Sequence, residues 1–571
     1  MLLSAFAEVI SVGAVLPFLG VLIAPDRLFH HPRMANLVNA WGITSADQLI
    51  LPLTVAFSLA ALVAGAIRVL LLWVSSRLAF ASGADLSIEV YRRTLYQPYH
   101  VHVARNSSEV ISGITKKVDG VVFYVLVPLL TLLSSAVLLV AITLVLFGIN
   151  PPVALVSTAA FAASYGLVAW LSRRRLRRSS ERIAYEQTQV IKALQEGLGG
   201  IRDVLLDGTQ PVYCDVYRHA DQRLRQAQSF IVVNGGSPRF AMEALGMVMI
   251  AALAYGLSRQ PGGIATALPL LGALALGAQR LLPALQQSYA AWANITASHE
   301  SLADTIALLD QPLPPEVLQP APPPLPFQHA IAFDAVRFRY AKNGPWVLDG
   351  LNLTIPKGSR IGIVGSTGGG KSTALDLIMG LLTPTEGQVL VDGEPLSGTR
   401  LRAWQKTIAH VPQNIYLADT TVAENIAFGV PRHAIDLPRV QKAARQAQIA
   451  TFIEDGAGGY DALVGERGIR LSGGQRQRIG VARALYKQAS VLVFDEATSA
   501  LDNATEQSVM DAIEGLPGDL TILLIAHRLT TVLRCGTIVQ LEHGHVVAQG
   551  TYDELLERSP TFRQMAQTVG Q

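Results

Sequence analysis

Cysteine is scarce in this chain: its 571 residues include only two, Cys214 and Cys535, far apart in sequence. Such a pair gives neither a disulfide framework nor the spacing of a metal site, so we expect two free thiols in a reducing compartment. Charge of one sign is also lacking, because 46 basic and 43 acidic residues leave a net charge of +3. This small excess, without interleaved basic and aromatic residues, argues against a nucleic-acid partner.

Hydrophobic residues are abundant: they make up 50% of the chain, and the mean hydropathy of +0.34 is high for a soluble enzyme. The excess is concentrated before residue 300. We predict an all-α transmembrane domain, with buried helices of a soluble fold as the alternative. Its six spanning helices, each near the roughly 20 residues that a bilayer requires, cover about 2–23, 51–80, 121–148, 152–171, 240–257 and 264–285.

The segments between these spans predict an orientation. Residues 83–120 and 172–239 are rich in arginine and lysine, including the run 173–178, and the positive-inside rule places both in the cytoplasm. Both are long enough to extend the helices beyond the membrane. Punctuation by proline and glycine near Gln97–Asn106 and Gly200–Val212 predicts a short transverse element at each tip.

A glycine-rich loop dominates the second half of the chain. Residues 365–373 read GSTGGGKST, after the apolar run Ile361–Val364 and before the helical run Thr373–Leu382. Strand, loop and helix in this order form a phosphate cradle, in which backbone N–H groups and a helix N-terminus meet phosphate oxygens. We predict that nucleotide binds to Gly365, Ser366, Thr367, Gly368, Gly369, Gly370, Lys371, Ser372 and Thr373, with Lys371 on the β- and γ-phosphates and Ser372 on Mg²⁺.

Later polar residues suit the remaining steps of ATP hydrolysis. Asp495 ends the apolar strand 490–496 and is expected to bind Mg²⁺, while Glu496 is placed to polarise an attacking water. His527 follows the strand 522–525 and suits contact with the γ-phosphate; a structural histidine is the alternative. Gln413, on a loop after a strand, suits Mg²⁺ or the attacking water.

Two further features complete the predicted nucleotide site. The Tyr340 ring suits stacking on adenine, with aromatic core packing as the alternative. The run Leu471–Gln475 reads LSGGQ and begins a helix, whose amides and dipole suit a γ-phosphate.

These motifs, in this order, resemble the nucleotide-binding domain of an ATP-binding-cassette (ABC) transporter over residues 329–571. The resemblance implies an α/β P-loop ATPase that pairs head to tail, so that Ser472, Gly473, Gly474 and Gln475 of one copy cover the ATP of the other. A homodimer is the simplest pairing. With the helical domain at 1–312 and a proline-rich, extended linker at 313–328, the chain resembles an ABC exporter half-transporter (type IV) of the bacterial inner membrane, with its ATPase in the cytoplasm.

The first span begins at Met1 without a basic flank or an amphipathic lead. We therefore expect a late-assigned start or a truncated first helix.

Several membrane passages are similar to the lipid-linked oligosaccharide flippase of bacterial protein N-glycosylation (the PglK type). They are 7–18, 106–118, 237–246 and 276–289, with 411–417 in the ATPase. The resemblance implies outward movement of a polyprenyl-diphosphate glycan. Arg68, Arg239 and Arg280 match arginines of that type. Arg68 and Arg280 interrupt predicted spans, where a charge is costly, and Arg239 lies at the cytoplasmic entry to the fifth span; the three are expected to face a cavity and bind the diphosphate. Structural pairing or snorkelling is the alternative.

Three functions remain open on this basis: a flippase for a lipid-linked anionic glycan, an exporter of another amphiphile (a drug, a peptide or a lipid A-like lipid), and a nucleotide-gated channel or regulator. Retention of both Glu496 and His527 argues against the last, because a binding switch does not require a hydrolytic apparatus.

Overall fold

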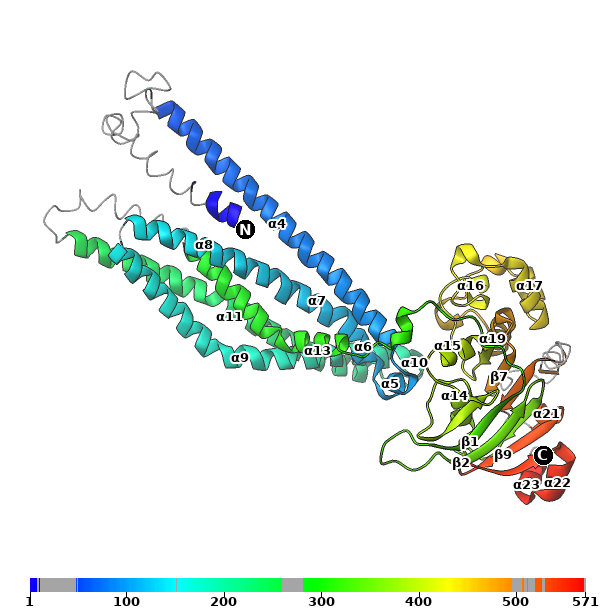
Figure 1. Cartoon of the computed structure of the whole chain (residues 1–571). Helices are drawn as coiled ribbons and strands as arrows, with labels where there is room; N and C mark the ends of the chain where they lie inside the picture. Colours follow the sequence, from blue (N-terminus) through cyan, green and yellow to red (C-terminus); the bar gives the residue numbers. More distant parts are fainter. Residues whose placement is uncertain are drawn as a thin grey trace. The chain divides into compact units, whose positions relative to one another are not determined.

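The computed structural model describes residues 1–7, 10, 48, 50–149, 151–258, 281–495, 506–507, 511, 519–525 and 529–568. The chain divides into two compact units (Figure 1). The helical unit comprises Met1–Gln97 and Arg105–Pro312, and the second unit comprises Pro98–Ala104 and Leu313–Gln571.

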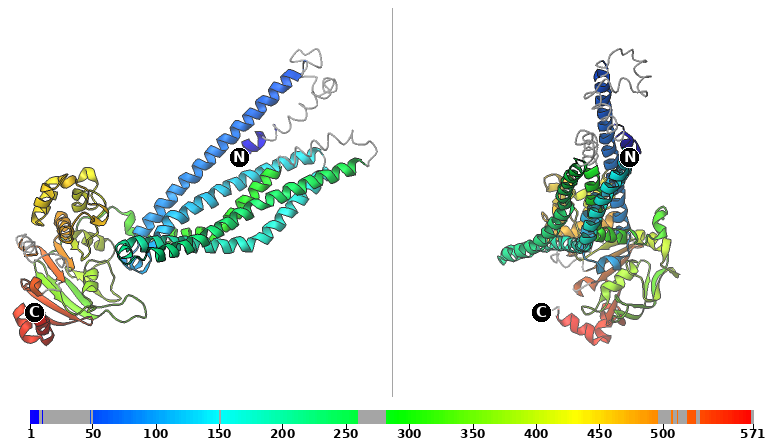
Figure 2. Two further views of the ribbon diagram at one scale, coloured as in Figure 1. Left: turned by 180° about the vertical axis from the view of Figure 1, so that it is seen from behind. Right: turned by 90° about the vertical axis from the view of Figure 1, so that its left-hand side faces the viewer.

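Long helices build the helical unit, and α9 and α11 run side by side within it (Figures 1 and 2). The elements are α4 (Ile50–Leu95), α6 (Ser107–Ser112), the π-helical turn η2 (Gly113–Lys117), α7 (Val118–Val121), the π-helical turn η3 (Val122–Leu126), α8 (Val127–Ile149), α9 (Pro151–Gly199), α10 (Ile201–Leu206), α11 (Gln210–Ser258), a helix over 281–297, and α13 (His299–Leu309).

Three of these helices are longer than a bilayer requires. Helix α4 has 46 residues and α9 and α11 have 49 each, whereas about 20 residues span the hydrocarbon core. These lengths agree with the predicted extension of the helices beyond the membrane. Within the described residues, two helical stretches are both long and apolar enough to cross a membrane, Ile50–Leu95 and Ser107–Val145.

The other predicted spans have different outcomes. Those at 152–171 and 240–257 fall in α9 and α11, whereas those at 2–23 and 264–285 lie mostly outside the described residues. Each segment predicted to hold a short transverse element contains a short helix, α5 (Tyr99–Ala104) in one and α10 in the other. Helix α5 belongs to the second unit, although it lies in the sequence of the first.

Close packing joins α4 to η3, and η2 to α13, within the helical unit. A Cβ atom on Gly83 of α4 would lie 2.4 Å from Val122 Cγ2, and one on Gly113 would lie 2.7 Å from Leu308 Cδ1 of α13. The Lys117 Nζ atom, on a side chain only 12% exposed, bonds Asp304 Oδ2 of α13 at 2.6 Å. Helix α13 is thus held against η2 by one apolar contact and one ion pair.

The linker at 313–328 is not extended throughout, contrary to the prediction. Residues 315–318 form a 3₁₀ turn, η4 (Pro315–Leu318), within the segment predicted to be extended. Proline permits this, because its fixed φ angle and missing N–H are tolerated in the first turn of a helix.

Two sheets form the frame of the second unit. The antiparallel sheet has the order β2-β1-β4-β5, and the larger sheet has the order β10-β9-β3-β8-β7-β6, with β9, β3, β8, β7 and β6 parallel. The strands are β1 (Ala330–Phe338), β2 (Leu348–Pro356), β3 (Arg360–Val364), β4 (Glu386–Val391), β5 (Glu394–Pro395), β6 (Ile408–Val411), β7 (Val491–Asp495), β8 (Thr521–Ile525), β9 (Thr537–Glu542) and β10 (His545–Gly550).

Both faces of the parallel sheet are buried, as their near-continuous apolar strands require. One hydrophobic core includes Ile363, Trp404 and Leu523, and the other includes Ile479, Phe494 and Leu524. The helices of this unit are α14 (Lys371–Ile378), α15 (Gly398–Thr407), α16 (Val422–Ile426), α17 (Leu437–Gln446), α18 (Ala450–Asp455), α19 (Gly473–Lys487), α21 (Leu529–Val532), α22 (Tyr552–Arg558) and α23 (Pro560–Thr568), with 3₁₀ turns η5 (Arg432–Ala434), η6 (Gly459–Asp461) and η7 (Glu466–Gly468).

The buried imidazole of His410 on β6 predicts acid sensitivity. Burial lowers the pKa of His410 from 6.5 to about 4, and its Nε2 atom has no hydrogen-bond partner among the described residues. The unfolded chain therefore binds more protons between pH 6.5 and 4, so stability falls as the pH falls through this window, by up to about 3 kcal/mol. His410→Phe is expected to flatten the pH dependence of thermal unfolding.

The matched control is His433→Phe at the exposed turn η5, which should leave the pH dependence unchanged. An equally steep loss of stability in His410→Phe would contradict the assignment.

Candidate nucleotide-binding site

The phosphate loop, Gly365–Thr373, joins β3 to α14 and begins at a position that requires glycine. Gly365 has φ of +148°, and a Cβ atom there would lie 1.9 Å from the Leu541 carbonyl oxygen. No side chain fits between the loop and β9 at this point, so the backbone itself forms the surface offered to a ligand.

Gly370 starts the helix that follows the loop. It caps α14 with φ of +96°, and a Cβ atom there would lie 2.7 Å from Leu348 Cδ2. Residues Ser366, Thr367 and Gly368 are exposed, while Gly369 and Gly370 are buried. An exposed loop on a helix N-terminus presents N–H groups and the positive end of the helix dipole to an anion.

Lys371 supplies a full positive charge at this place. Its residue is only 6% exposed, and its Nζ atom donates to the carbonyl oxygens of Gly365 and Ser366, at 2.9 Å each. These bonds hold the ammonium within the curve of the loop. A compact ammonium of this kind is a usual partner of phosphate.

Tyr340 lies beside the phosphate loop. Its hydroxyl is 3.1 Å from the Thr373 hydroxyl, and its ring meets Phe338 edge to face with centroids 5.0 Å apart. The Tyr340 residue is nevertheless 59% exposed. The ring therefore remains available for stacking on a nucleotide base.

The parallel register brings the other predicted residues to the same edge of the sheet. Ile525 of β8 pairs both with Ile363 of β3 and with Asp495 of β7. Val411 of β6 pairs with Phe494, so the segment that carries Gln413 leaves from this edge. Neighbouring strands lie about 4.8 Å apart, and four chain segments that are distant in sequence thus end together.

Two predicted catalytic residues lie outside the described residues. Glu496 directly follows Asp495, and His527 comes two residues after Ile525. The ends of β7 and β8 are described, and both strands reach the edge at which the phosphate loop begins.

The oxygen donors at this edge suit Mg²⁺. Ser372 offers an exposed hydroxyl, Gln413 an amide oxygen and Asp495 a carboxylate, all hard ligands. Within the described residues, no group of three or more histidine, cysteine, aspartate or glutamate side chains could hold a metal alone. The oxygen donors of Ser372, Gln413 and Asp495 fit Mg²⁺ that is shared with nucleotide phosphates.

The LSGGQ run forms a well-capped helix start. Ser472 caps α19: its hydroxyl accepts from Gln475 N, and Gln475 Oε1 accepts from Ser472 N at 2.8 Å. Ser472 is exposed, and Gly473 and Gly474 form the first turn. The start of α19 is thus a second place where backbone amides and a helix dipole face outward.

Known proteins share both units. Family models match residues 34–260, as "ABC transporter transmembrane region", and residues 348–499, as "ABC transporter". The ATP-dependent lipid A-core flippase of Chromohalobacter salexigens is 32% identical over 84% of this chain and 82% of its own length. The flippase of the same description from Alkalilimnicola ehrlichii is 34% identical over 73% of this chain and 68% of its own.

This chain belongs to the ABC transporter family. A solved structure agrees with the whole architecture: it is described as a bacterial Atm1-family ABC exporter with ATP bound, is 26% identical, and gives a TM-score of 0.82 over 99% of this chain and 97% of that chain. The predicted helical membrane domain followed by an α/β ATPase is therefore confirmed. The chain is an ATP-hydrolysing transporter.

Arg483 of this ABC transporter is a structural link near the site that the sequence did not predict. From α19, its guanidinium donates to the carbonyl oxygens of Tyr416 and Asn425, at 3.1 and 2.9 Å, and lies 4.4 Å from the Phe428 ring centroid. Burial lowers the pKa of Arg483 to about 10. The residue ties the helix that starts at Ser472 to the segment that follows Gln413, and only the fold places its partners together.

Asp376 was also missed, although the sequence carries a signal for it: it is the one acidic residue in the otherwise apolar run after the phosphate loop. It lies half-buried on α14. Burial, and then the charge of Asp495, raises the pKa of Asp376 from 3.8 to about 6. A second carboxyl group thus stands near the proposed Mg²⁺ ligand.

The proposed substrate arginines are only partly described. Arg68 lies in α4 and is exposed in the single chain. Arg239 lies in α11, where its Nε atom pairs with Glu243 Oε1 at 2.9 Å, and Arg280 lies outside the described residues. The pairing of Arg239 favours the structural alternative for that residue.

The raised pKa of Asp376 predicts a stabilising substitution. Between pH 4 and 6 the folded chain binds more protons than the unfolded chain, so the contribution of this carboxyl is lost as the pH rises through 6. At pH 7.5, Asp376→Asn should raise the stability of the nucleotide-free ATPase unit by about 1 kcal/mol, discounted for partial exposure. Thermal unfolding measures this change.

Asp392→Asn provides a control of opposite sign. Although burial works the other way, backbone N–H donors from Gln328, His329 and Ala330 lower the pKa of Asp392. Its neutralisation should therefore lower the unfolding temperature. If Asp376→Asn destabilises the unit as well, the assigned burial cost is wrong.

Proposed function

We propose that two copies of this chain form an ATP-driven flippase that moves an anionic glycolipid outward across the bacterial inner membrane. Similarity to curated lipid A-core flippases over more than four fifths of both chains carries this proposal. A phosphorylated glycolipid of the lipid A-core kind is therefore the first candidate substrate.

A polyprenyl-diphosphate-linked oligosaccharide is the second candidate. It is supported by the resemblance of residues 106–118 and 237–246 to the PglK-type flippase, and by the arginines at 68 and 280. The pairing of Arg239 with Glu243 leaves that arginine a structural role. Both candidates carry phosphate groups and long lipid tails, so the same cationic chamber suits either one.

The arrangement of residues at this edge of the parallel sheet supports separate roles for them in ATP hydrolysis. Backbone N–H groups of the phosphate loop and Lys371 bind the phosphates, and Tyr340 stacks on the base. Ser372, Gln413 and Asp495 would hold Mg²⁺, and the ion would supply positive charge against the phosphates. Glu496 polarises the attacking water, and His527 contacts the γ-phosphate.

The partner copy completes each site in this proposal. The exposed start of α19, at Ser472, Gly473, Gly474 and Gln475, is the element that covers the γ-phosphate held by the other chain. A homodimer supplies two complete sites because one sequence contains both halves. The basic segments 83–120 and 172–239 place this ATPase on the cytoplasmic side.

Glu496→Gln tests the chemistry. Glutamine keeps the shape but cannot accept a proton, so we expect ATP hydrolysis to fall by at least about a hundredfold while two nucleotides remain bound per closed dimer. Turnover and stoichiometry after rapid desalting measure this. Asp511→Asn is a control that should retain turnover, because Asp511 is exposed and pairs with Arg534. Normal hydrolysis by Glu496→Gln would remove that residue from the role of base.

Transport in proteoliposomes tests the substrate. Vesicles with labelled lipid A-core, labelled polyprenyl-diphosphate glycan or a neutral labelled amphiphile are compared with and without ATP. We expect ATP-dependent movement of a phosphorylated glycolipid and none of the neutral probe. Loss of movement in Arg280→Gln, with basal ATPase retained, would support a cationic chamber. Equal movement of all three probes would refute selectivity for an anionic glycolipid.

A further inference from the structure

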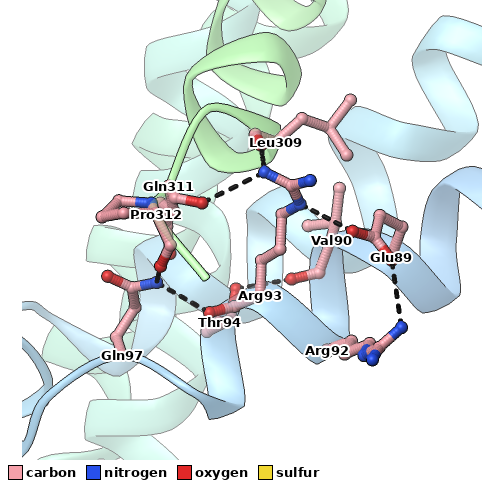
Figure 3. Close-up of polar contacts among 9 residues, drawn as sticks. All are labelled: Glu89, Val90, Arg92, Arg93, Thr94, Gln97, Leu309, Gln311 and Pro312. Carbon is pink, nitrogen blue, oxygen red and sulfur yellow. Dashed lines mark hydrogen bonds and ion pairs between the residues drawn. The ribbon is translucent and has the colours of Figure 1, made fainter. Parts of the chain in front are cut away.

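A polar cluster joins two distant parts of the chain at the end of α4 (Figure 3). The chain passes between its two units at three bonds: Gln97–Pro98, Ala104–Arg105 and Pro312–Leu313. Gln97 Nε2 donates to the Pro312 carbonyl oxygen at 3.1 Å, across a sequence separation of 215 residues. The first and the last of the three crossings are thus bonded to each other within the helical unit.

Arg93 makes the strongest contacts in this cluster. Its Nε atom donates to Glu89 Oε1 at 2.7 Å, and its Nη1 atom donates to the carbonyl oxygens of Leu309 and Gln311, the latter at 3.1 Å (Figure 3). Leu309 is the last residue of α13, where helix carbonyls have no partner within the helix, and Gln311 follows just beyond the C-cap Asp310. A guanidinium there satisfies them and complements the negative end of the helix dipole.

The body of α13 does not depend on Arg93. Lys117 pairs with Asp304, and Leu308 packs directly against Gly113. Loss of the Arg93 contacts should therefore free the last turn of α13 and the exit at Pro312, while the rest of the helix stays in place.

We propose that Arg93 and Gln97, with the carbonyls of Leu309, Gln311 and Pro312, form an exit joint that makes the two crossings move together. Movement of the ATPase then reaches α4 and the end of α13 as a single step. The inference rests on the proposed function, since the joint would couple ATP turnover to lipid movement. Arg93 is a positioning residue, because its contacts among the described residues are with Glu89 of α4 and with the carbonyls of Leu309 and Gln311.

Arg93→Gln tests the exit joint, with Arg92→Gln as a matched control. Arg92 directly precedes Arg93 in α4. Its side chain is more exposed than that of Arg93, and it reaches Glu89 only at 4.0 Å. Glutamine cannot bridge Glu89 and two carbonyls, so we expect lipid moved per ATP hydrolysed to fall about tenfold, with basal ATPase within about twofold of the parent. Arg93→Lys should be intermediate, because an ammonium lacks the planar fork.

Hydrogen exchange of residues 305–312 gives a second readout in the full-length dimer. In the parent and in Arg92→Gln, trapping with ATP should change exchange at the amides of residues 305–311, since Pro312 has no N–H. In Arg93→Gln, exchange at these amides should be fast with and without ATP. If Arg93→Gln does not fold, Gln97→Glu replaces it, since a carboxylate cannot donate to the Pro312 carbonyl. This variant should show the same changes at smaller amplitude.

Three results would overturn the exit joint: unchanged transport per ATP in the tested variant, a proportional loss of ATPase and transport that marks a purely structural role, or equal effects in Arg92→Gln. A parent that hydrolyses ATP but moves no labelled lipid would refute the proposed substrate instead. The exchange of residues 305–312 would then decide the joint without transport.

Discussion

The compensation of phosphate charge at one edge of the parallel sheet is the constraint on which this structure depends. A triphosphate needs many donors in a small volume, and side chains are too bulky to supply them all. The loop after β3 meets this need with backbone, because Gly365 approaches the Leu541 carbonyl too closely for any side chain. Parallel pairing then places Asp495 and the start of the Gln413 segment at the same edge.

At the same edge of the sheet, two neighbouring carboxyl groups lower the stability of the fold. Asp376 and Asp495 put two carboxyl groups near one another, and burial raises the pKa of the first to about 6. A bound cation would relieve this repulsion, so the arrangement fits a site that is completed by Mg²⁺ and nucleotide. Without nucleotide and Mg²⁺, the burial of Asp376 beside Asp495 therefore lowers the stability of the ATPase unit.

The chain passes between the ATPase unit and the helical unit at three covalent crossings. Within the helical unit, α13 is held at two places. Lys117 pairs with Asp304 in the body of the helix, and Arg93 bonds the Leu309 carbonyl at its end. Long helices such as α4 then carry a displacement at one end over their full length, because a continuously hydrogen-bonded helix resists bending.

The sequence by itself determined the chemistry and the order of domains. Local patterns sufficed for the phosphate loop, the capped start at Ser472, the strands before Gly365 and Asp495, and the long basic extensions of the membrane helices, since each depends on neighbours only a few residues away. Arg483, Asp376 and Arg93 could not be assigned in this way. Their partners lie 58, 119 and 216 residues along the chain, at Asn425, Asp495 and Leu309. Which charges meet across such separations is decided by packing and strand register, so only the tertiary structure gave their roles.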